Sequence, residues 1–228
     1  MSGLDRTEDA RLGEDLEFFG QVTASVTHQI NNVLSVVAEL NGLLDDLARA
    51  AGEDRPVAPQ KLADVAGRIQ RQVERGVGYV DRLNEFAHAV DEPRGPVDLT
   101  AAVSAVEALA QRMAVLRRAE LSCTVPAEPV TVTSRGFRVL RVIYRGVELA
   151  LAGGGRGRSV QMALQTTPGT AKVVIGSSDP LDAASDSLEL QDSLLGLAGD
   201  LGVQADVEPG AAAGGARITL RWTVGTRD

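Results

Sequence analysis

"VTASVTHQINNVLSVVAELNGLLDDL", residues 22–47, is the stretch that decides the fold. Its apolar residues recur at steps of four and three, and residues 16–50 contain no proline. This spacing is typical of a helix with one apolar stripe, here sustained over about four heptads. The stripe consists of Val22, Val26, Ile30, Val33, Val37, Leu40, Leu44 and Leu47.

A second stripe predicts a second helix. The segment "RAAGEDRPVAPQ", residues 49–60, interrupts the first pattern with glycine, charge and two prolines. The new stripe consists of Leu62, Val65, Ile69, Val73, Val77, Val80, Leu83 and Ala87, and it ends before the linker "DEPRGP". Two long helices with a short connection are expected to pack as an antiparallel hairpin. One hairpin buries little of these stripes, so we expect a homodimer in which two hairpins form a four-helix bundle.

The remainder of the chain predicts a different architecture. Two further long helical patterns and a shorter one alternate with short strand patterns, several of which follow each other as hairpins. Helices that segregate from a mostly antiparallel sheet define an α+β class. We therefore expect a flexible tail at 1–15, a helical hairpin domain at 16–92 and an α/β-sandwich at 97–228.

Composition excludes several function classes. The formal net charge is −8, and the basic residues are scattered singly, as in Arg68, Arg71, Arg75 and Arg82, which disfavours a nucleic-acid or anionic-membrane surface. The N-terminus is polar and acidic, and no apolar run reaches the length of a membrane span, so we expect a soluble cytoplasmic protein. Cys123 is the only cysteine, which excludes an internal disulfide, and its alternating context predicts a buried strand thiol.

His28 is one of only two histidines, and it does not belong to the stripe. At about 100° per residue it lies about 200° from the neighbouring stripe residues, so the imidazole is expected to face solvent. Asn32 follows one turn later on the same side. His88 falls near the end of the second helix, where a cation is mildly favourable, and is expected to be an exposed cap residue.

The stretch "GQVTASVTHQINNVLSVVAELNGLL" resembles the phosphoacceptor helix of sensor histidine kinases, which typically reads H-E-x-x-N-P. "IQRQVERGVGYVDRLNEFA" resembles the partner helix, and the later α+β half resembles the kinase ATP-binding domain in element order. The resemblance implies that His28 carries a phosphoryl group and that Asn32 can orient a water. A neutral imidazole nitrogen is nucleophilic near neutral pH, which suits this role. Gln29 takes the place of the family's acid and cannot act as a general base.

The nucleotide motifs of the family are missing. Aligned on its apolar positions, "RVIYRGVELAL" places Arg145 and Leu149 where two asparagines belong, and leucine has no oxygen for Mg²⁺. Asp179 and Asp182 stand near the position of the family's D-x-G-x-G, without its glycines. The glycine-rich pieces "GGGRGRS" (153–159) and "GAAAGGA" (210–216) do not match a phosphate-binding loop and are expected to be connections.

This combination resembles the histidine phosphotransferases that are built like degenerate kinases. The resemblance implies a relay between receiver-domain aspartates of response regulators through His28, without ATP and without a cofactor, because Mg²⁺ comes from the receiver. A hybrid histidine kinase is a further candidate partner. Gln21, Thr27, Gln29, Asn32 and Ser35 are expected to fringe the site, with Arg75 and Tyr79 as second-helix contributors. The alternatives are a non-catalytic pseudokinase that regulates a receiver or kinase, and a divergent ATP-dependent kinase.

Overall fold

The structure is a computed structural model that describes residues 3–51, 56–91, 94–152, 157–181, 185–210 and 215–224. The chain divides into two compact units, Met1–Ala87 and His88–Asp228. The sequence placed the linker between residues 92 and 97, whereas the division falls within the last turns of the second helix.

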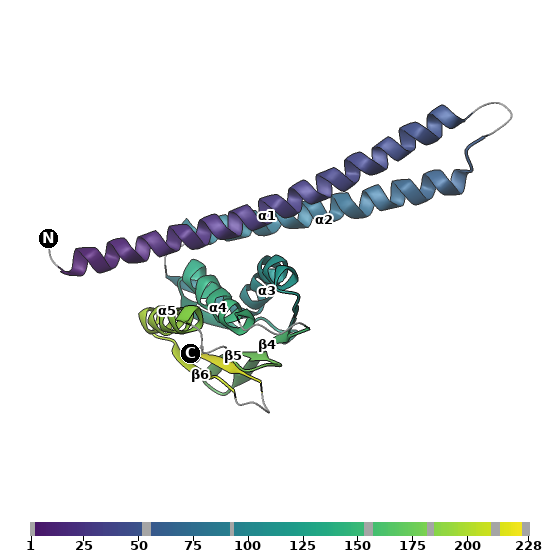
Figure 1. Ribbon diagram of the computed structural model, residues 1–228. Coiled ribbons are helices and arrows are strands. Elements are labelled where there is room, and N and C mark those ends of the chain that lie inside the picture. The colour runs from purple at the N-terminus through teal and green to yellow at the C-terminus, as the bar shows by residue number, and fades with distance from the viewer. Residues whose placement is uncertain are drawn as a thin grey trace. The chain divides into compact units, whose positions relative to one another are not determined.

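The first unit is a helical hairpin. Helix α1 (Gly3–Ala50) and helix α2 (Pro59–Asp91) run antiparallel (Figure 1). Helix α1 begins at Gly3, within the segment 1–15 that the sequence analysis expected to be a flexible tail. Residues 4–15 contain no proline, and their one glycine, Gly13, weakens a helix by about 1 kcal/mol relative to alanine without ending it.

The predicted stripe of α1 faces α2. Val22, Val26, Val33 and Leu40 are buried, and the other four stripe residues are half-buried. Towards the end of α2, the ring centroid of Phe86 lies 5.5 Å from the ring centroid of Phe18 and 5.5 Å from that of Phe19. The first heptad pattern is thus confirmed as a packing surface.

The stripe predicted for α2 is wrong between residues 73 and 80. Val73, Val77 and Val80 remain exposed, and the residues of α2 that are buried or half-buried follow another line with the same steps. The reason is Gly76, where an added Cβ would lie 3.3 Å from Val33 Cγ1. Glycine lets the two backbones approach, and this turns the valines away from α1. The observed line is Val65, Ile69, Gln72, Gly76, Tyr79, Leu83 and Phe86.

The second unit is α+β, as expected. A small antiparallel pair joins β1 (Gly95–Asp98) to β3 (Thr131–Ser134). The five-stranded sheet has the order β2-β4-β5-β7-β6, in which only the β2–β4 pair is parallel. Its strands are β2 (Glu120–Thr124), β4 (Ser159–Thr167), β5 (Thr170–Ser177), β6 (Gln204–Glu208) and β7 (Arg217–Thr223).

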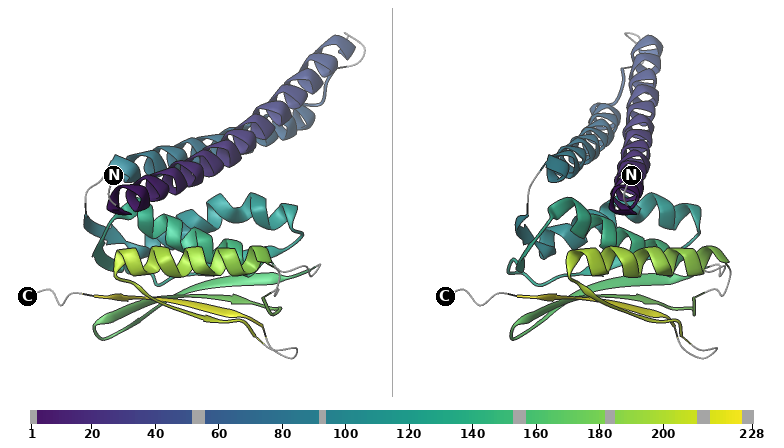
Figure 2. Two further views of the ribbon diagram at one scale, coloured as in Figure 1. Left: turned by 60° about the vertical axis from the view of Figure 1, so that its left-hand side comes forward. Right: turned by 90° about the vertical axis from the view of Figure 1, so that its left-hand side faces the viewer.

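Three helices cover one face of this sheet, as Figure 2 shows: α3 (Leu99–Leu116), α4 (Gly136–Leu151) and α5 (Ser185–Leu201). The alternation of β4 and β5 turns Met162, Val173 and Ile175 into the core. Gly146 brings α4 against the sheet, because a Cβ there would lie 2.6 Å from Ile175 Cδ1. Among the described helices, α3 alone has the length and apolar content of a membrane span, and seven of its residues are buried within this unit.

Two details differ from the expectations above. Gly95 and Pro96, which were expected in the linker, belong to β1. Proline has no backbone N–H to donate, and it is tolerated here because both strands of a two-stranded sheet are edge strands. Cys123 does lie on strand β2, but it is half-buried, because β2 is an edge strand. Burial raises the pKa of its thiol, and the nearby Glu107 carboxylate raises it further.

Candidate functional site

The candidate site is the surface of α1 around His28. His28 and Asn32 are both exposed, whereas Gln29 is half-buried. No hydrogen bond or ion pair engages the His28 imidazole within the described part of the chain. The expectation that this imidazole faces solvent is confirmed, and a partner can therefore reach it directly.

The surface of α1 beside His28 is polar but uncharged. Residues 18–38 contain no Asp, Glu, Lys or Arg, and the nearest carboxylates on α1 are those of Glu17 and Glu39. The expected fringe residues Gln21, Thr27 and Ser35 are exposed. Gln21 donates to Glu17 at 3.1 Å, and Ser35 donates to the Asn31 carbonyl at 3.0 Å. An anion that approaches His28 thus meets no carboxylate on α1 within two turns.

The packing of the hairpin fixes which part of α2 lies level with His28. His28 is five residues before Val33, so the Val33–Gly76 contact places it level with Asp81. It is ten residues after Phe18, so the Phe18–Phe86 contact places it level with Gly76. The two contacts therefore bracket its level between Gly76 and Asp81, a stretch that contains Tyr79.

Helical geometry shows which side of the hairpin His28 shares. Counted from Val33, His28 and Asn32 fall about 140° and about 100° round α1 in one rotational sense. Counted from Gly76, Arg75 and Arg82 fall about 100° and about 120° round α2 in the same sense. In an antiparallel pair of helices, residues that are rotated from the contact in the same sense, each about its own helix axis, lie on the same side of the pair. His28, Asn32 and these two arginines therefore share one side of the hairpin.

The arginines of α2 are not scattered, contrary to the expectation from the sequence. Arg68, Arg75 and Arg82 recur every seven residues, and Arg71 lies beside them on the same side. We call these four residues the arginine stripe. The predicted contributors Arg75 and Tyr79 are in contact, with a guanidinium nitrogen 3.5 Å from the phenol oxygen. Arg82 stacks over the same ring at 5.7 Å. Sequence reasoning missed Arg82, although its heptad spacing could have revealed it.

The opposite side of the hairpin is apolar. Leu34 on α1 and Val73, Val77 and Val80 on α2 fall in the other rotational sense. Leu34 is 58% exposed and Val77 is 55% exposed, and they share this side of the hairpin with two further exposed valines, so the residues form a patch and are not scattered singly. We call these four residues the apolar face. The hairpin thus separates an apolar side from a polar side that carries His28.

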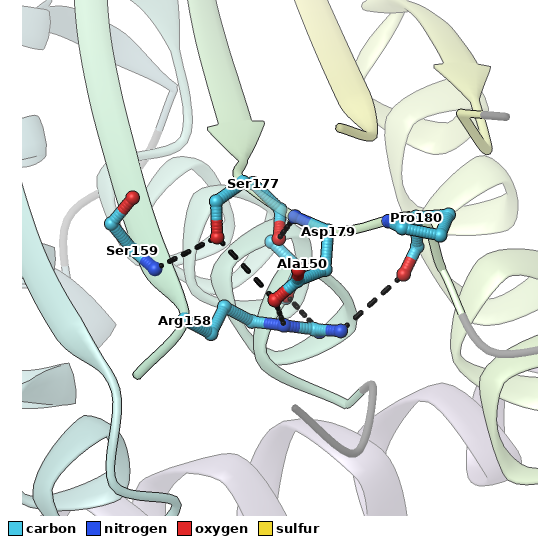
Figure 3. Close-up of polar contacts among 7 residues, drawn as sticks. Ala150, Arg158, Ser159, Ser177, Asp179 and Pro180 are labelled. Atoms are coloured by element: carbon cyan, nitrogen blue, oxygen red, sulfur yellow. Dashed lines mark hydrogen bonds and ion pairs between the residues drawn. The ribbon is translucent and has the colours of Figure 1, made fainter. Parts of the chain in front are cut away.

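In the second unit, the residues at the predicted nucleotide positions are occupied by other contacts. Leu149 is fully buried in the core, and Arg145 forms an ion pair with Glu148 at 2.7 Å. Arg158 is only 3% exposed and donates to the carbonyls of Ala150 and Pro180 at 2.9 and 3.3 Å (Figure 3). Its Nε lies 3.2 Å from Asp179 Oδ2. These residues do not fit Mg-ATP, since neither Arg145 nor Leu149 can coordinate the metal and Asp179 is bound to a cation of the protein.

Arg158 was not recognised as a special residue in the sequence, because a single arginine in a glycine-rich segment carries no signal of burial. Asp182 and most of the two glycine-rich segments lie outside the described residues. His88 is exposed in the last turn of α2, as expected. No group of three or more His, Cys, Asp or Glu side chains within the described ranges is arranged to hold a metal ion.

No protein-family model matches the sequence, and neither does any curated protein. Solved structures of several histidine kinases resemble the chain. The catalytic domain of histidine kinase ThkA is 12% identical, covers 58% of this chain and 96% of its own, and gives a TM-score of 0.49. Histidine kinase AdeS of Acinetobacter baumannii is 12% identical, with 87% of this chain and 98% of its own covered and a TM-score of 0.48.

The crystal structure of ThkA in complex with the response regulator protein TrrA covers all of this chain and 69% of its own, at 15% identity and a TM-score of 0.47. With TM-scores below 0.5, these similarities alone decide neither the family nor the function of this chain. The α+β architecture itself follows from the elements and sheet order described above.

Proposed function

We propose that this chain is a histidine phosphotransfer protein that relays a phosphoryl group between receiver-domain aspartates of response regulators through His28, without ATP. The observation that carries the proposal is the exposed, unengaged imidazole of His28 on an uncharged helix surface.

The chemistry requires only positioning and charge stabilisation. In the loading step, a neutral ring nitrogen of His28 attacks the phosphorus of an aspartyl phosphate. The P–N bond forms as the bond from phosphorus to the aspartate oxygen breaks, and the receiver recovers its carboxylate. The phosphoimidazolium then loses the proton of its other nitrogen to water. The reverse sequence on a second receiver unloads His28. Mg²⁺ is supplied by the receiver, so the chain itself needs no cofactor.

Asn32 and Gln29 are proposed to support this step. The exposed Asn32 amide lies one turn from His28 on the same side, where it can hold a water or a phosphoryl oxygen by hydrogen bonds. Gln29 is half-buried beside the imidazole position and can only hydrogen-bond, which is compatible with transfer and not with a general base for attack on ATP.

The apolar face supports a homodimer. Leu34, Val73, Val77 and Val80 lie on the side away from His28, so a second copy can cover them and leave both imidazoles accessible. We propose that two hairpins form a four-helix bundle in this way. The partners are receiver domains, with a hybrid histidine kinase as a further candidate, and the location is the cytoplasm. Nucleic acid and membrane are not proposed as partners.

The test is transfer from a panel of receiver domains charged with labelled acetyl phosphate, using the wild type and His28→Gln. Acid-labile label on the wild type only, together with none from Mg-ATP in a parallel tube, supports the relay. Label from Mg-ATP alone would contradict the proposal and revive the kinase.

A second candidate is a regulatory pseudokinase that binds a receiver with His28 unmodified. The observation that favours it is Gln29, since loss of the acid beside the histidine removes a catalytic group. Stable receiver binding by both the wild type and His28→Gln, with no label on either, would support this reading.

A further inference from the structure

We propose that the arginine stripe of α2 is an electrostatic dock for the phosphoryl-bearing acidic surface of the donor receiver. This inference rests on the proposed function and names the residues that recruit its partner. Three of the arginines line a shallow surface hollow of about 470 Å³, together with Glu74, Gly78 and Tyr79.

The arginines of this hollow are not neutralised by carboxylates. Arg75 is bonded to Gln72 and Tyr79, both uncharged, and Arg82 stacks on the Tyr79 ring. The carboxylate of Glu74 accepts from Gln70 at 3.0 Å. Within the described hairpin, no ion pair engages Arg71, Arg75 or Arg82. Like charges at i and i+4, as in Arg71 and Arg75, destabilise an isolated helix by a few tenths of a kcal/mol, which is about the size of one ordinary i,i+4 pair.

The placement of the stripe ties it to His28. Arg75 and Arg82 flank the stretch from Gly76 to Asp81 that lies level with the imidazole, and they share its side of the hairpin. On α1 the same side has no charge between Phe18 and Ala38. The residues that line the hollow include three arginines and one carboxylate, that of Glu74, so the hollow carries an excess of positive charge even though the whole chain carries a net charge of −8. At physiological salt, interactions between exposed charges are largely screened beyond about 8 Å, so these arginines act on a partner that is already close to the helix surface.

Gly78 supplies a second, independent sign of a docking surface. It lies inside α2, where glycine costs about 1 kcal/mol relative to alanine. Unlike Gly76, it is not explained by packing against α1, because the only atom near an added Cβ is Arg82 Nη2 at 3.7 Å. Gly78 leaves the hollow open between the arginine side chains, which a group from a partner can then enter.

The occupant fits by charge. An aspartyl phosphate carries a phosphoryl group of about two negative charges, and guanidinium groups are well suited to bind phosphoryl and carboxylate oxygens. Clefts of one sign of charge raise association rates by about 10- to 1,000-fold and lose this effect in salt. The dock is thus expected to act on encounter with the receiver and not on the chemical step at His28.

The experiment measures receiver binding and phosphoryl transfer with the full chain, using the same receiver panel. The double variant R75E/R82E is expected to lower kcat/KM for transfer by about tenfold or more at low ionic strength, with kcat at saturating receiver changed by less than about twofold. The wild-type rate is expected to fall with added salt, and the rate of the variant is expected to stay flat. The control is K61E, a single charge reversal that lies about 21 Å from Arg75 and about 31 Å from Arg82 along α2.

The outcomes separate this inference from the proposed function. If the wild type transfers phosphoryl groups but R75E/R82E and K61E lower kcat/KM equally, the dock is overturned and the relay is left intact. The same holds if the rate of the wild type does not depend on salt. Binding without transfer removes the relay, and the same two variants then test the dock by dissociation constants. Because both substitutions are on an exposed helix surface, circular dichroism is expected to show unchanged helix content. If no receiver binds the wild type, both the dock and the relay are refuted.

Discussion

Two glycines in α2, only two residues apart, provide a sharp test of the hairpin packing that positions His28. Replacing either glycine by alanine in a helix interior is worth about 1 kcal/mol of stabilisation from helix propensity alone. At Gly78 the new Cβ would lie 3.7 Å from Arg82 Nη2, an ordinary contact with the end of a flexible side chain. Gly78→Ala is therefore expected to gain about 1 kcal/mol.

At Gly76 the same atom would lie 3.3 Å from Val33 Cγ1, and Val33 is only 6% exposed. Most of the propensity gain of Gly76→Ala is thus expected to be lost as Val33 shifts. A leucine magnifies the contrast, because overpacking a helix interface costs about 1–3 kcal/mol, whereas the leucine of Gly78→Leu would point to open surface. Gly76→Leu is expected to be about 2 kcal/mol less stable than Gly78→Leu.

The measurement is urea unfolding followed by far-ultraviolet circular dichroism. All variants are compared at one protein concentration, since self-association makes unfolding midpoints depend on concentration. Equal stability of Gly76→Leu and Gly78→Leu would refute the close approach of α2 to Val33. The register that brackets His28 between Gly76 and Asp81 would then be wrong as well.

Three further predictions concern the apolar face, Arg158 and Tyr144. Leu34→Asp is expected to remove about 2 kcal/mol of apolar burial per copy and to raise the dimer dissociation constant about a thousandfold, as measured by sedimentation. The control is the adjacent Ser35→Asp on the other side of α1, which is expected to leave the dissociation constant unchanged. Equal effects of the two substitutions would exclude the apolar face as the interface. Arg158→Met is expected to destabilise the second unit by about 3 kcal/mol in thermal unfolding, because two carbonyls lose a charged donor. The control is Arg135→Met at an exposed position, which is expected to have little effect. An Arg158→Met variant as stable as the wild type would show that these hydrogen bonds make no net contribution to stability. Burial, with the Glu148 carboxylate adding to it, raises the pKa of Tyr144 to about 12, so the folded state keeps a proton that the unfolded state releases above its ordinary value of 10. Stability is therefore expected to fall as the pH rises from 10 towards 12 and to fall less in Tyr144→Phe. An ultraviolet titration in which Tyr144 ionises near pH 10 in the folded protein would contradict this.

The elements of the fold were predictable because their signals are local. The heptad steps of α1, the alternation in β4 and β5 and the capping Asp98 before α3 are all readable from neighbouring residues. β1 was missed because four residues around a proline carry no periodicity, and they become a strand only by pairing with β3. Its pairing is a long-range contact that the segment itself does not encode.

The part of the site on α1 could be predicted from the sequence, whereas the rotation of α2 relative to α1 could not. The exposure of His28 follows from its angle to the stripe of α1. The rotation of α2 does not follow from its own sequence, because Val73, Val77 and Val80 form as good a stripe as the residues that actually face α1. Only the contact of Gly76 with Val33 decides between them, and it also gathers the arginines on the side of His28.

The proposed relay requires that His28 accepts a phosphoryl group from one receiver and passes it to another. The most direct measurement is a rapid-quench time course with a labelled phosphorylated receiver, this chain and an unphosphorylated second receiver, in the absence of ATP. A relay through His28 predicts that label leaves the first receiver, appears transiently on His28 as acid-labile phosphate and then accumulates on the second receiver, with all transfer abolished in His28→Gln. Label that reaches the second receiver at the same rate with His28→Gln, or that never appears on His28, would contradict it.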